Sequence, residues 1–192
     1  IPARLKSTRL PNKPLIKIQG KEILLRTYER CLLAVNEPKN IIVATDHQSI
    51  FSFCQENNIN VVMTSDHCLT GTDRVCEVAK KINADTYINV QGDEPILDPD
   101  DLKKIIANVE KDPNKIYNGY AEIKTEHNYF SPNIPKVIFN PNTKELMYMS
   151  RAAIPANKSF TFERAWKQVC IYAFPKDSLT AFSANDKTPL EA

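Results

Sequence analysis

The sequence lacks long apolar runs, a strong charge of either sign and a common phosphate-binding motif. No apolar run approaches the roughly 18 residues of a membrane-spanning helix, so we expect no membrane partner. The 25 basic and 23 acidic residues leave a net charge of +2, which argues against a dedicated nucleic-acid binder. A GxxxxGK[ST] loop is also absent, so any phosphate binding is of another kind. The remaining composition is that of an ordinary globular domain.

The cysteines follow no CxxC or Cys/His metal spacing. They are Cys31, Cys54, Cys68, Cys76 and Cys170. Such a set favours reduced thiols in a cytoplasmic protein over a disulfide framework or a zinc site. The chain starts as if inside a strand and stops at Ala192 without a stop signal, so we expect residues to be missing at both ends.

Strand-like and helix-like segments alternate along residues 1–111. We expect strands at 15–18, 41–44, 60–64 and 87–90, and helices at 22–35, 48–57, 73–82 and 99–111. This alternation predicts an α/β fold, with a Rossmann-like, mostly parallel sheet and helices on both of its faces. Further strands at 116–124, 136–140, 145–149 and 168–174 are expected to extend the sheet and supply a small antiparallel arm.

Two acids follow the strand in the stretch 87–95, which reads YINVQGDEP. Ligands of α/β proteins bind off the carboxyl ends of strands, so Asp93 is well placed to hold Mg²⁺ against phosphates. A plain turn with solvated acids accounts for the same residues. The stretch therefore marks a candidate site without deciding its chemistry.

Basic residues gather in the Pro-rich segment 1–14. Arg4, Arg9 and Lys13 could converge on a triphosphate, and the alternative is an exposed basic terminus. Gly71 and Thr72 stand where the amides of a helix start could meet an anion. Taken alone, Thr72 is better explained as an ordinary N-cap.

Several short motifs occur together across the whole chain: IPARLKSTRLPNKPL at 1–15, IVATDH at 42–47, TGTDR at 70–74, NVQGDEP at 89–95, SPNIPKV at 131–137, SRAAIP at 150–155, Ile171-Tyr172 and PLE at 189–191. In this order they resemble the CMP-Kdo synthetases, the cytidylyltransferases that activate 3-deoxy-D-manno-octulosonate (Kdo). The resemblance implies one domain over 1–192, with a CTP-binding half at 1–111 and a sugar-binding and dimerisation half at 112–192.

The resemblance also implies a reaction. The anomeric hydroxyl of a 2-keto-3-deoxy sugar acid attacks the α-phosphorus of CTP, yielding a CMP-sugar and pyrophosphate for lipopolysaccharide or capsule synthesis. Mg²⁺ is the implied cofactor, and a homodimer is the implied assembly. A last acidic metal ligand would follow the PLE segment, beyond the printed sequence.

Roles for individual residues follow from the matching motifs. The implied catalytic residues are Arg4, Lys13 and Asp93, and Asp93 is also the implied metal ligand. The implied CTP contacts are Ala3, Arg4, Ser7, Lys13, Thr70, Arg74 and Gln91. The implied sugar contacts are Arg151, Gln168, Tyr172 and Glu191.

The chain departs from the family pattern in its sugar-binding half. Lys167 and Gln168 stand where the family usually has Arg-His, and Cys170 replaces a usual Gly. We therefore expect Gln168 to meet a changed substituent of the sugar, with a solvent-facing Gln168 as the alternative.

Two other functions stay open: a cytidylyltransferase for another acid, such as a nonulosonate or a phosphonate, and a non-catalytic nucleotide-binding module.

Aromatic residues of the Pro-rich region suggest an interface. We expect the region around 127–165 to expose several of them, since it has little else to bury them against. They are Tyr129, Phe130, Phe160, Phe162 and Trp166. Packing within the chain's own core is the alternative.

Overall fold

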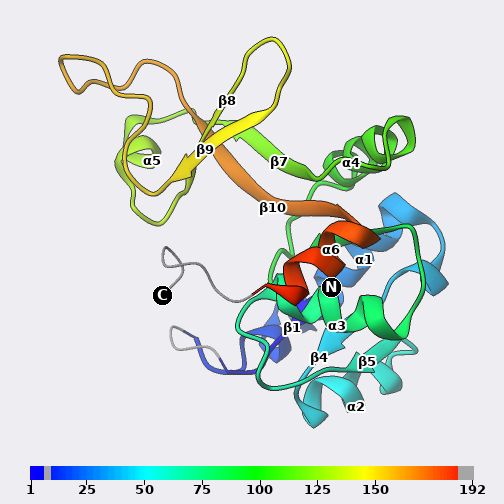
Figure 1. Ribbon diagram of the computed structural model, residues 1–192. Coiled ribbons are helices and arrows are strands. Elements are labelled where there is room, and N and C mark those ends of the chain that lie inside the picture. The colour runs from blue at the N-terminus through cyan, green and yellow to red at the C-terminus, as the bar shows by residue number, and fades with distance from the viewer. Residues whose placement is uncertain (7–9, 186–192) are drawn as a thin grey trace. The chain divides into compact units, whose positions relative to one another are not determined.

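The computed structural model describes residues 1–6 and 10–185 and divides the chain into two compact units (Figure 1). The first unit comprises Ile1–Tyr117 and Ile171–Ala192, and the second comprises Asn118–Cys170. The expected functional halves, 1–111 and 112–192, follow a different boundary, because residues 171–185 belong to the first unit. Their functional assignment stays a prediction.

The first unit contains a three-stranded parallel sheet in the order β1-β4-β5. Its strands are β1 (Pro2–Ala3), β4 (Val43–Thr45) and β5 (Val61–Met63). Every residue of β4 is buried, as the apolar run at 41–44 predicts for a strand covered on both faces. This parallel sheet and the helices packed around it confirm the predicted α/β fold.

Helices connect the strands of the first unit. The α-helices are α1 (Ile23–Val35), α2 (Gln48–Glu56), α3 (Gly71–Lys81), α4 (Pro99–Lys111) and α6 (Lys176–Ala184). Two short 3₁₀ helices, η1 (Lys13–Leu15) and η2 (Pro38–Asn40), and a hairpin of β2 (Lys17–Ile18) and β3 (Lys21–Glu22) complete the connections. Helix α1 packs against α4, while α3 packs against α6 and contacts β1, β4 and β6.

Strand β6 (Thr86–Val90) leads to the candidate site and pairs antiparallel with the end of β10 (Trp166–Pro175). Ile171 lies opposite Val90 in this ladder. At the end of β6, the Gly92 amide donates to the Pro2 carbonyl at 3.1 Å, which ties this turn to β1. The strand expected at 168–174 is thus present and extends the strand system of the first unit.

A small apolar cluster joins β6, α3 and α6. It contains Val75 and Cys76 of α3, Tyr87 of β6 and Leu179 of α6. The Tyr87 hydroxyl donates to the Ile82 carbonyl at 2.7 Å and accepts from the Ala84 amide at 3.0 Å, so its polar end is satisfied. Burying each such side chain contributes about 1.5–3 kcal/mol, which fixes β6 and therefore the turn that follows it.

The second unit is built from β7 (Tyr117–Glu122), α5 (Glu126–Phe130), β8 (Lys136–Phe139), β9 (Leu146–Ser150) and the start of β10. Strands β8 and β9 form an antiparallel hairpin, and β8 also pairs with β10 at Trp166 and Lys167. Ile123, Tyr129 and Ala165 form its buried core. This unit is the antiparallel arm that the sequence predicts.

The structure corrects several local predictions. The strand expected at 15–18 is a 3₁₀ turn followed by only Lys17 and Ile18, and helices α5 and α6 were not expected. Helix α3 begins at Gly71, and its N-cap is Thr70 instead of the expected Thr72. Asp73 explains this shift, because it completes a reciprocal capping box with Thr70.

Candidate functional site

A pocket of about 100 Å³ gathers most of the implied CTP contacts within the first unit. Its lining residues are Pro2, Ala3, Arg4, Cys68, Leu69, Thr70, Gly71, Arg74 and Gln91. The implied contacts among them come from three separate motifs and meet only in the folded chain. They are Ala3, Arg4, Thr70, Arg74 and Gln91.

Strand ends and a helix start bring these residues together. Ala3 ends β1, and Gln91 directly follows β6. Thr70 and Gly71 stand at the start of α3, whose amino end carries a partial positive charge. The pocket thus lies where α/β folds hold their ligands, off strand ends and next to a helix N-terminus.

The Thr70 side chain is occupied in capping α3. Its hydroxyl lies 2.7 Å from Asp73 Oδ2 and also accepts from the Asp73 amide at 3.3 Å. The Thr70 amide donates to the same carboxylate at 2.7 Å. Thr70 therefore fixes the helix start at the pocket wall, and its hydroxyl can donate to a ligand only by giving up its bond to Asp73.

Arg74 lines the pocket from α3 and is only 2% exposed. Its Nη2 lies 3.0 Å from Asp46 Oδ2, just beyond β4, while its Nη1 donates to the Thr64 hydroxyl and, at 3.4 Å, to the Ser65 carbonyl. These partners come from the ends of β4 and β5. Arg74 thus joins two strand ends to α3, a structural role that the sequence did not predict.

Lys13 and Asp93, two of the three implied catalytic residues, form an ion pair. Their side chains are 36% and 39% exposed, so both can be reached from solvent. The third, Arg4, lines the neighbouring pocket and is exposed. The structure therefore brings the implied phosphate-binding lysine to the implied metal ligand.

Helix α1 holds the turn that carries Asp93. The buried Thr27 hydroxyl lies 3.3 Å from the Gly92 carbonyl, and Arg30 Nε donates to the Leu97 carbonyl at 2.6 Å. Glycine is required at 92, because a Cβ there would stand 2.9 Å from the Pro2 carbonyl oxygen. Thr27 and Arg30 belong to no motif of the sequence, so their contribution to the site was missed.

The implied sugar contacts are divided between the two units. Arg151 and Gln168 belong to the second unit, and Tyr172 belongs to the first. Arg151 Nη1 donates to the Pro132 carbonyl at 2.9 Å, and the Tyr172 ring stacks on Phe174 with centroids 5.9 Å apart. Ser7 and Glu191 lie outside the described residues.

The buried lysine Lys136 holds the loops around Arg151. Its ammonium is fully buried and donates to the carbonyls of Ser131 at 2.7 Å, Ile134 at 2.9 Å and Arg151 at 2.9 Å. Burial, followed by the charge of Arg151, lowers the pKa of Lys136. With its three donors used on backbone, Lys136 supports the SPNIPKV and SRAAIP loops instead of contacting substrate.

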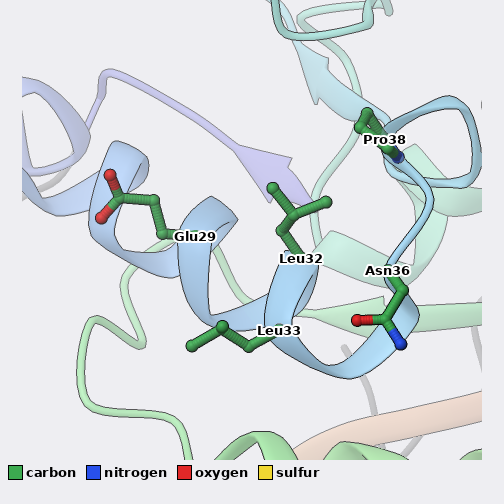
Figure 2. Close-up of a pocket in the computed structure, with 5 residues that line it drawn as sticks. All are labelled: Glu29, Leu32, Leu33, Asn36 and Pro38. Carbon is green, nitrogen blue, oxygen red and sulfur yellow. The ribbon is translucent and has the colours of Figure 1, made fainter.

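A larger open pocket of about 460 Å³ lies elsewhere on the first unit. Figure 2 shows its five lining residues along α1 and at η2: Glu29, Leu32, Leu33, Asn36 and Pro38. Its single acid, Glu29, pairs with Lys21 at 2.7 Å. The wall offers no cation for a triphosphate and includes no implied site residue, so the smaller pocket is the candidate site.

Groups that could ligate a metal are few at the candidate site. Across residues 1–6 and 10–185, three or more His, Cys, Asp or Glu side chains nowhere gather closely enough to hold an ion. Asp93 is the carboxylate that pairs with Lys13, an implied phosphate ligand. In the same described part of the chain, no helix is long and apolar enough to cross a membrane.

Comparison with known proteins identifies the family of the chain. A family model described as cytidylyltransferase matches residues 1–192. The 3-deoxy-manno-octulosonate cytidylyltransferase of Geobacter metallireducens is 37% identical over 205 residues, covering 100% of this chain and 79% of its own. The enzyme of that name from Psychrobacter cryohalolentis is 35% identical over 206 residues, covering 100% and 76%.

A solved structure of the same family is also similar to this chain in fold. The structure of CMP:2-keto-3-deoxy-manno-octonic acid synthetase complexed with CTP matches with a TM-score of 0.89 and 34% identity. The match covers 98% of this chain and 77% of that one. The chain therefore belongs to the cytidylyltransferase family, among the 3-deoxy-manno-octulosonate cytidylyltransferases.

Proposed function

We propose that this enzyme transfers CMP from CTP to the anomeric hydroxyl of Kdo or a close variant. The observation that carries the proposal is the pocket at the start of α3, in which Ala3, Arg4, Thr70, Arg74 and Gln91 meet. The neighbouring Lys13–Asp93 pair supplies a cation for phosphates and a carboxylate for a metal. The name of the CTP-bound synthetase supports the choice of nucleotide.

The proposed step is an in-line displacement at the α-phosphorus. The sugar hydroxyl gives up its proton to water as its oxygen bonds to the α-phosphorus, and the bond to the bridging oxygen of pyrophosphate breaks. Pyrophosphate leaves with the bonding electron pair. Arg4 and Lys13 would neutralise its negative charge, and the fixed walls of the pocket would hold the nucleotide in line.

Asp93 fits the ligand that Mg²⁺ needs beside a nucleotide. Mg²⁺ is usually bound by one or two carboxylates and by substrate phosphates, so it needs no all-protein cage. The Asp93 carboxylate is 39% exposed, and its partner Lys13 is itself a phosphate-binding group. When bound there, Mg²⁺ would neutralise the charge that builds on the phosphates.

From their motifs, Arg151, Gln168, Tyr172 and Glu191 are assigned to the sugar acid. Ser7 is assigned to CTP on the same ground. A guanidinium suits the sugar carboxylate, and the Gln168 amide suits a hydroxyl or amide substituent. The relatives' name, 3-deoxy-manno-octulosonate cytidylyltransferase, supports Kdo itself. Lipopolysaccharide or capsule synthesis would use the product.

A homodimer is proposed through the second unit. Tyr129 is buried in the core of this unit, and Phe162 packs against that core, so these two are not free for an interface. Phe130 and Phe160 remain exposed, as do Met147 and Tyr148 of β9. An exposed apolar surface of this kind supports an interface. A monomeric mass in light scattering at micromolar concentration would refute it.

The thiols support a reducing cytoplasm as the site of action. None of the five cysteines, all of which lie within the described residues, forms a disulfide bond. Cysteines outside disulfides are typical of proteins from compartments that keep thiols reduced.

The experiment that tests the proposed function measures pyrophosphate release with CTP and a panel of acids. We expect Kdo to be the best substrate and to give an equal amount of CMP-Kdo. Turnover with a nonulosonate or a phosphonate and none with Kdo would favour the related enzyme. CTP binding without turnover on any acid would favour a binding module.

A further inference from the structure

Gln91 lies next to two residues, Asn89 and Gly71, at the wall of the candidate pocket. Its Nε2 donates to Asn89 Oδ1, two residues back, at 3.4 Å. It also lies against Gly71, the first residue of α3, where a Cβ would stand 2.9 Å from Gln91 Nε2 and 3.1 Å from Oε1. The carboxamide therefore occupies the space that a side chain at residue 71 would need.

Asn89 does not itself line the pocket, and its hydrogen bond to Gln91 links it to the pocket wall. It is fully buried, and within the described residues its Nδ2 has no hydrogen-bond partner. An unpaired buried donor destabilises a fold, so an apolar residue would suit this position better on stability alone. The contact that distinguishes Asn89 from an apolar residue is the acceptor it presents to Gln91.

The hydrogen bond to Asn89 sets the orientation of the Gln91 carboxamide, because it turns Nε2 and not Oε1 towards Asn89 Oδ1. With one Nε2 hydrogen given to Asn89, the other hydrogen and Oε1 remain side by side for a ligand. That pair complements the cytosine edge, where an amino donor stands next to a ring-nitrogen acceptor. Uracil presents a carbonyl acceptor in place of the amino donor, as thymine does, so it fits only the opposite amide orientation.

We propose that Gly71 and Asn89 are positioning residues that fix the Gln91 carboxamide in the orientation that selects cytosine over uracil. The proposal rests on the proposed use of CTP. Gly71 leaves the room that the carboxamide needs, and Asn89 sets its orientation. The resemblance placed Gln91 among the implied CTP contacts and gave neither Gly71 nor Asn89 a part in orienting it.

The test measures the dissociation constants of CTP and UTP by calorimetry on the complete chain. In Gly71→Ala, the new methyl displaces the flexible carboxamide, and the helical backbone of α3 accepts alanine well. We expect CTP affinity to fall about tenfold, which is 1.4 kcal/mol. We expect the preference for CTP over UTP to fall with it, while the melting temperature stays within about 2 °C.

Asn89→Leu tests the orientation of the Gln91 carboxamide at the second positioning residue. It removes the acceptor without adding bulk at the pocket and should relax the CTP preference, whereas Asn89→Asp keeps an acceptor and should retain it. Thr72→Ala is the matched control, since Thr72 follows Gly71 in α3 but does not line the pocket. It should bind both nucleotides as the unaltered protein does.

The outcomes separate the proposal from the function on which it rests. If Gly71→Ala fails to fold, Asn89→Leu decides. An unchanged CTP preference in the folded variants would overturn the positioning role and leave the proposed function standing. Failure of the unaltered protein to prefer CTP over UTP would overturn both.

Discussion

The Lys13 ammonium and the Asp93 carboxylate form an ion pair across 80 positions of sequence. Lys13 opens η1, and Asp93 follows β6 in a turn that α1 holds through Thr27 and Arg30. Both partners have stronger ligands in the proposed reaction, because phosphate oxygens attract the lysine and a divalent ion attracts the carboxylate. CTP and Mg²⁺ would therefore replace the pair together.

The first prediction concerns Lys13→Ala. A lysine that meets the outer phosphates contributes about 1.5–3 kcal/mol through charge-assisted hydrogen bonds, so CTP affinity should fall by about ten- to one-hundred-fold. CMP lacks those phosphates and should lose much less. Calorimetry with both nucleotides measures the difference, and equal losses would place Lys13 away from the outer phosphates.

Asp46→Leu should destabilise the fold. It leaves the guanidinium of Arg74, whose side chain is 3% exposed, without its carboxylate. Stranding one member of a buried ion pair costs about 3–5 kcal/mol in the free energy of unfolding. Urea denaturation measures this loss.

The control for Asp46→Leu is Lys104→Ala, which removes the exposed i,i+3 pair with Asp101 on α4. Its unfolding midpoint should stay unchanged, since exposed pairs contribute little. A loss below about 1 kcal/mol in Asp46→Leu would show that Thr64 and Ser65 suffice to hold Arg74.

Cys68 should resist alkylation although it lines the candidate pocket. Burial, followed by the hydrogen bond to Glu77, raises the pKa of the Cys68 thiol from 9.0 to about 12. Since the thiolate is the reactive form, alkylation of Cys68 at pH 8 should be slow and should rise steeply only above pH 11. Peptide mapping after iodoacetamide treatment follows this site.

The raised pKa of Cys68 also makes the free energy of unfolding depend on pH. The folded thiol binds its proton more tightly than the unfolded one, so this contribution is complete below about pH 9 and is lost as pH rises towards 12. Glu77→Gln removes the charge that helps hold the proton, so the pKa of Cys68 should fall and its alkylation at pH 8 should accelerate. Rapid alkylation of the unaltered protein at pH 8 would contradict this account.

Gln168→His tests whether residue 168 determines which substituent of the sugar the enzyme prefers. The Gln168 amide both donates and accepts, and an imidazole would alter which substituent is favoured. We expect the ratio of kcat/KM for Kdo to that for an amino- or deoxy-substituted analogue to change several-fold. A change below about threefold, under the 1.4 kcal/mol of a tenfold effect, would remove Gln168 from specificity.

The sequence indicates the candidate site residues more readily than the residues that hold them in place. The resemblance to the CMP-Kdo synthetases assigned Arg4, Thr70 and Gln91 to CTP, and the structure brings them to one pocket. Arg30 and Asn89 act through a backbone carbonyl and an amide, contacts that depend on tertiary packing and leave no motif. The contribution of these supports therefore became visible only in the folded chain.

The N-cap of α3 and helices α5 and α6 show a second limit. Both Thr70 and Thr72 suit an N-cap, and the choice depends on whether Asp73 folds back, which it does at 2.7 Å from the Thr70 amide. Helix α5 spans only Glu126–Phe130, too short for helical periodicity to be visible. Helix α6 is held by Leu179, a contact with α3 made across the fold.

The most direct test of the central claim, that Asp93 is the metal-binding carboxylate of a CTP-dependent transferase, is Asp93→Asn. CMP-Kdo formation and CTP binding are measured on the same preparation with Mg²⁺ and Kdo. We predict that turnover is lost, because removing the charge costs several kcal/mol of transition-state stabilisation, while CTP binding remains measurable. Near-normal kcat in Asp93→Asn would contradict the account.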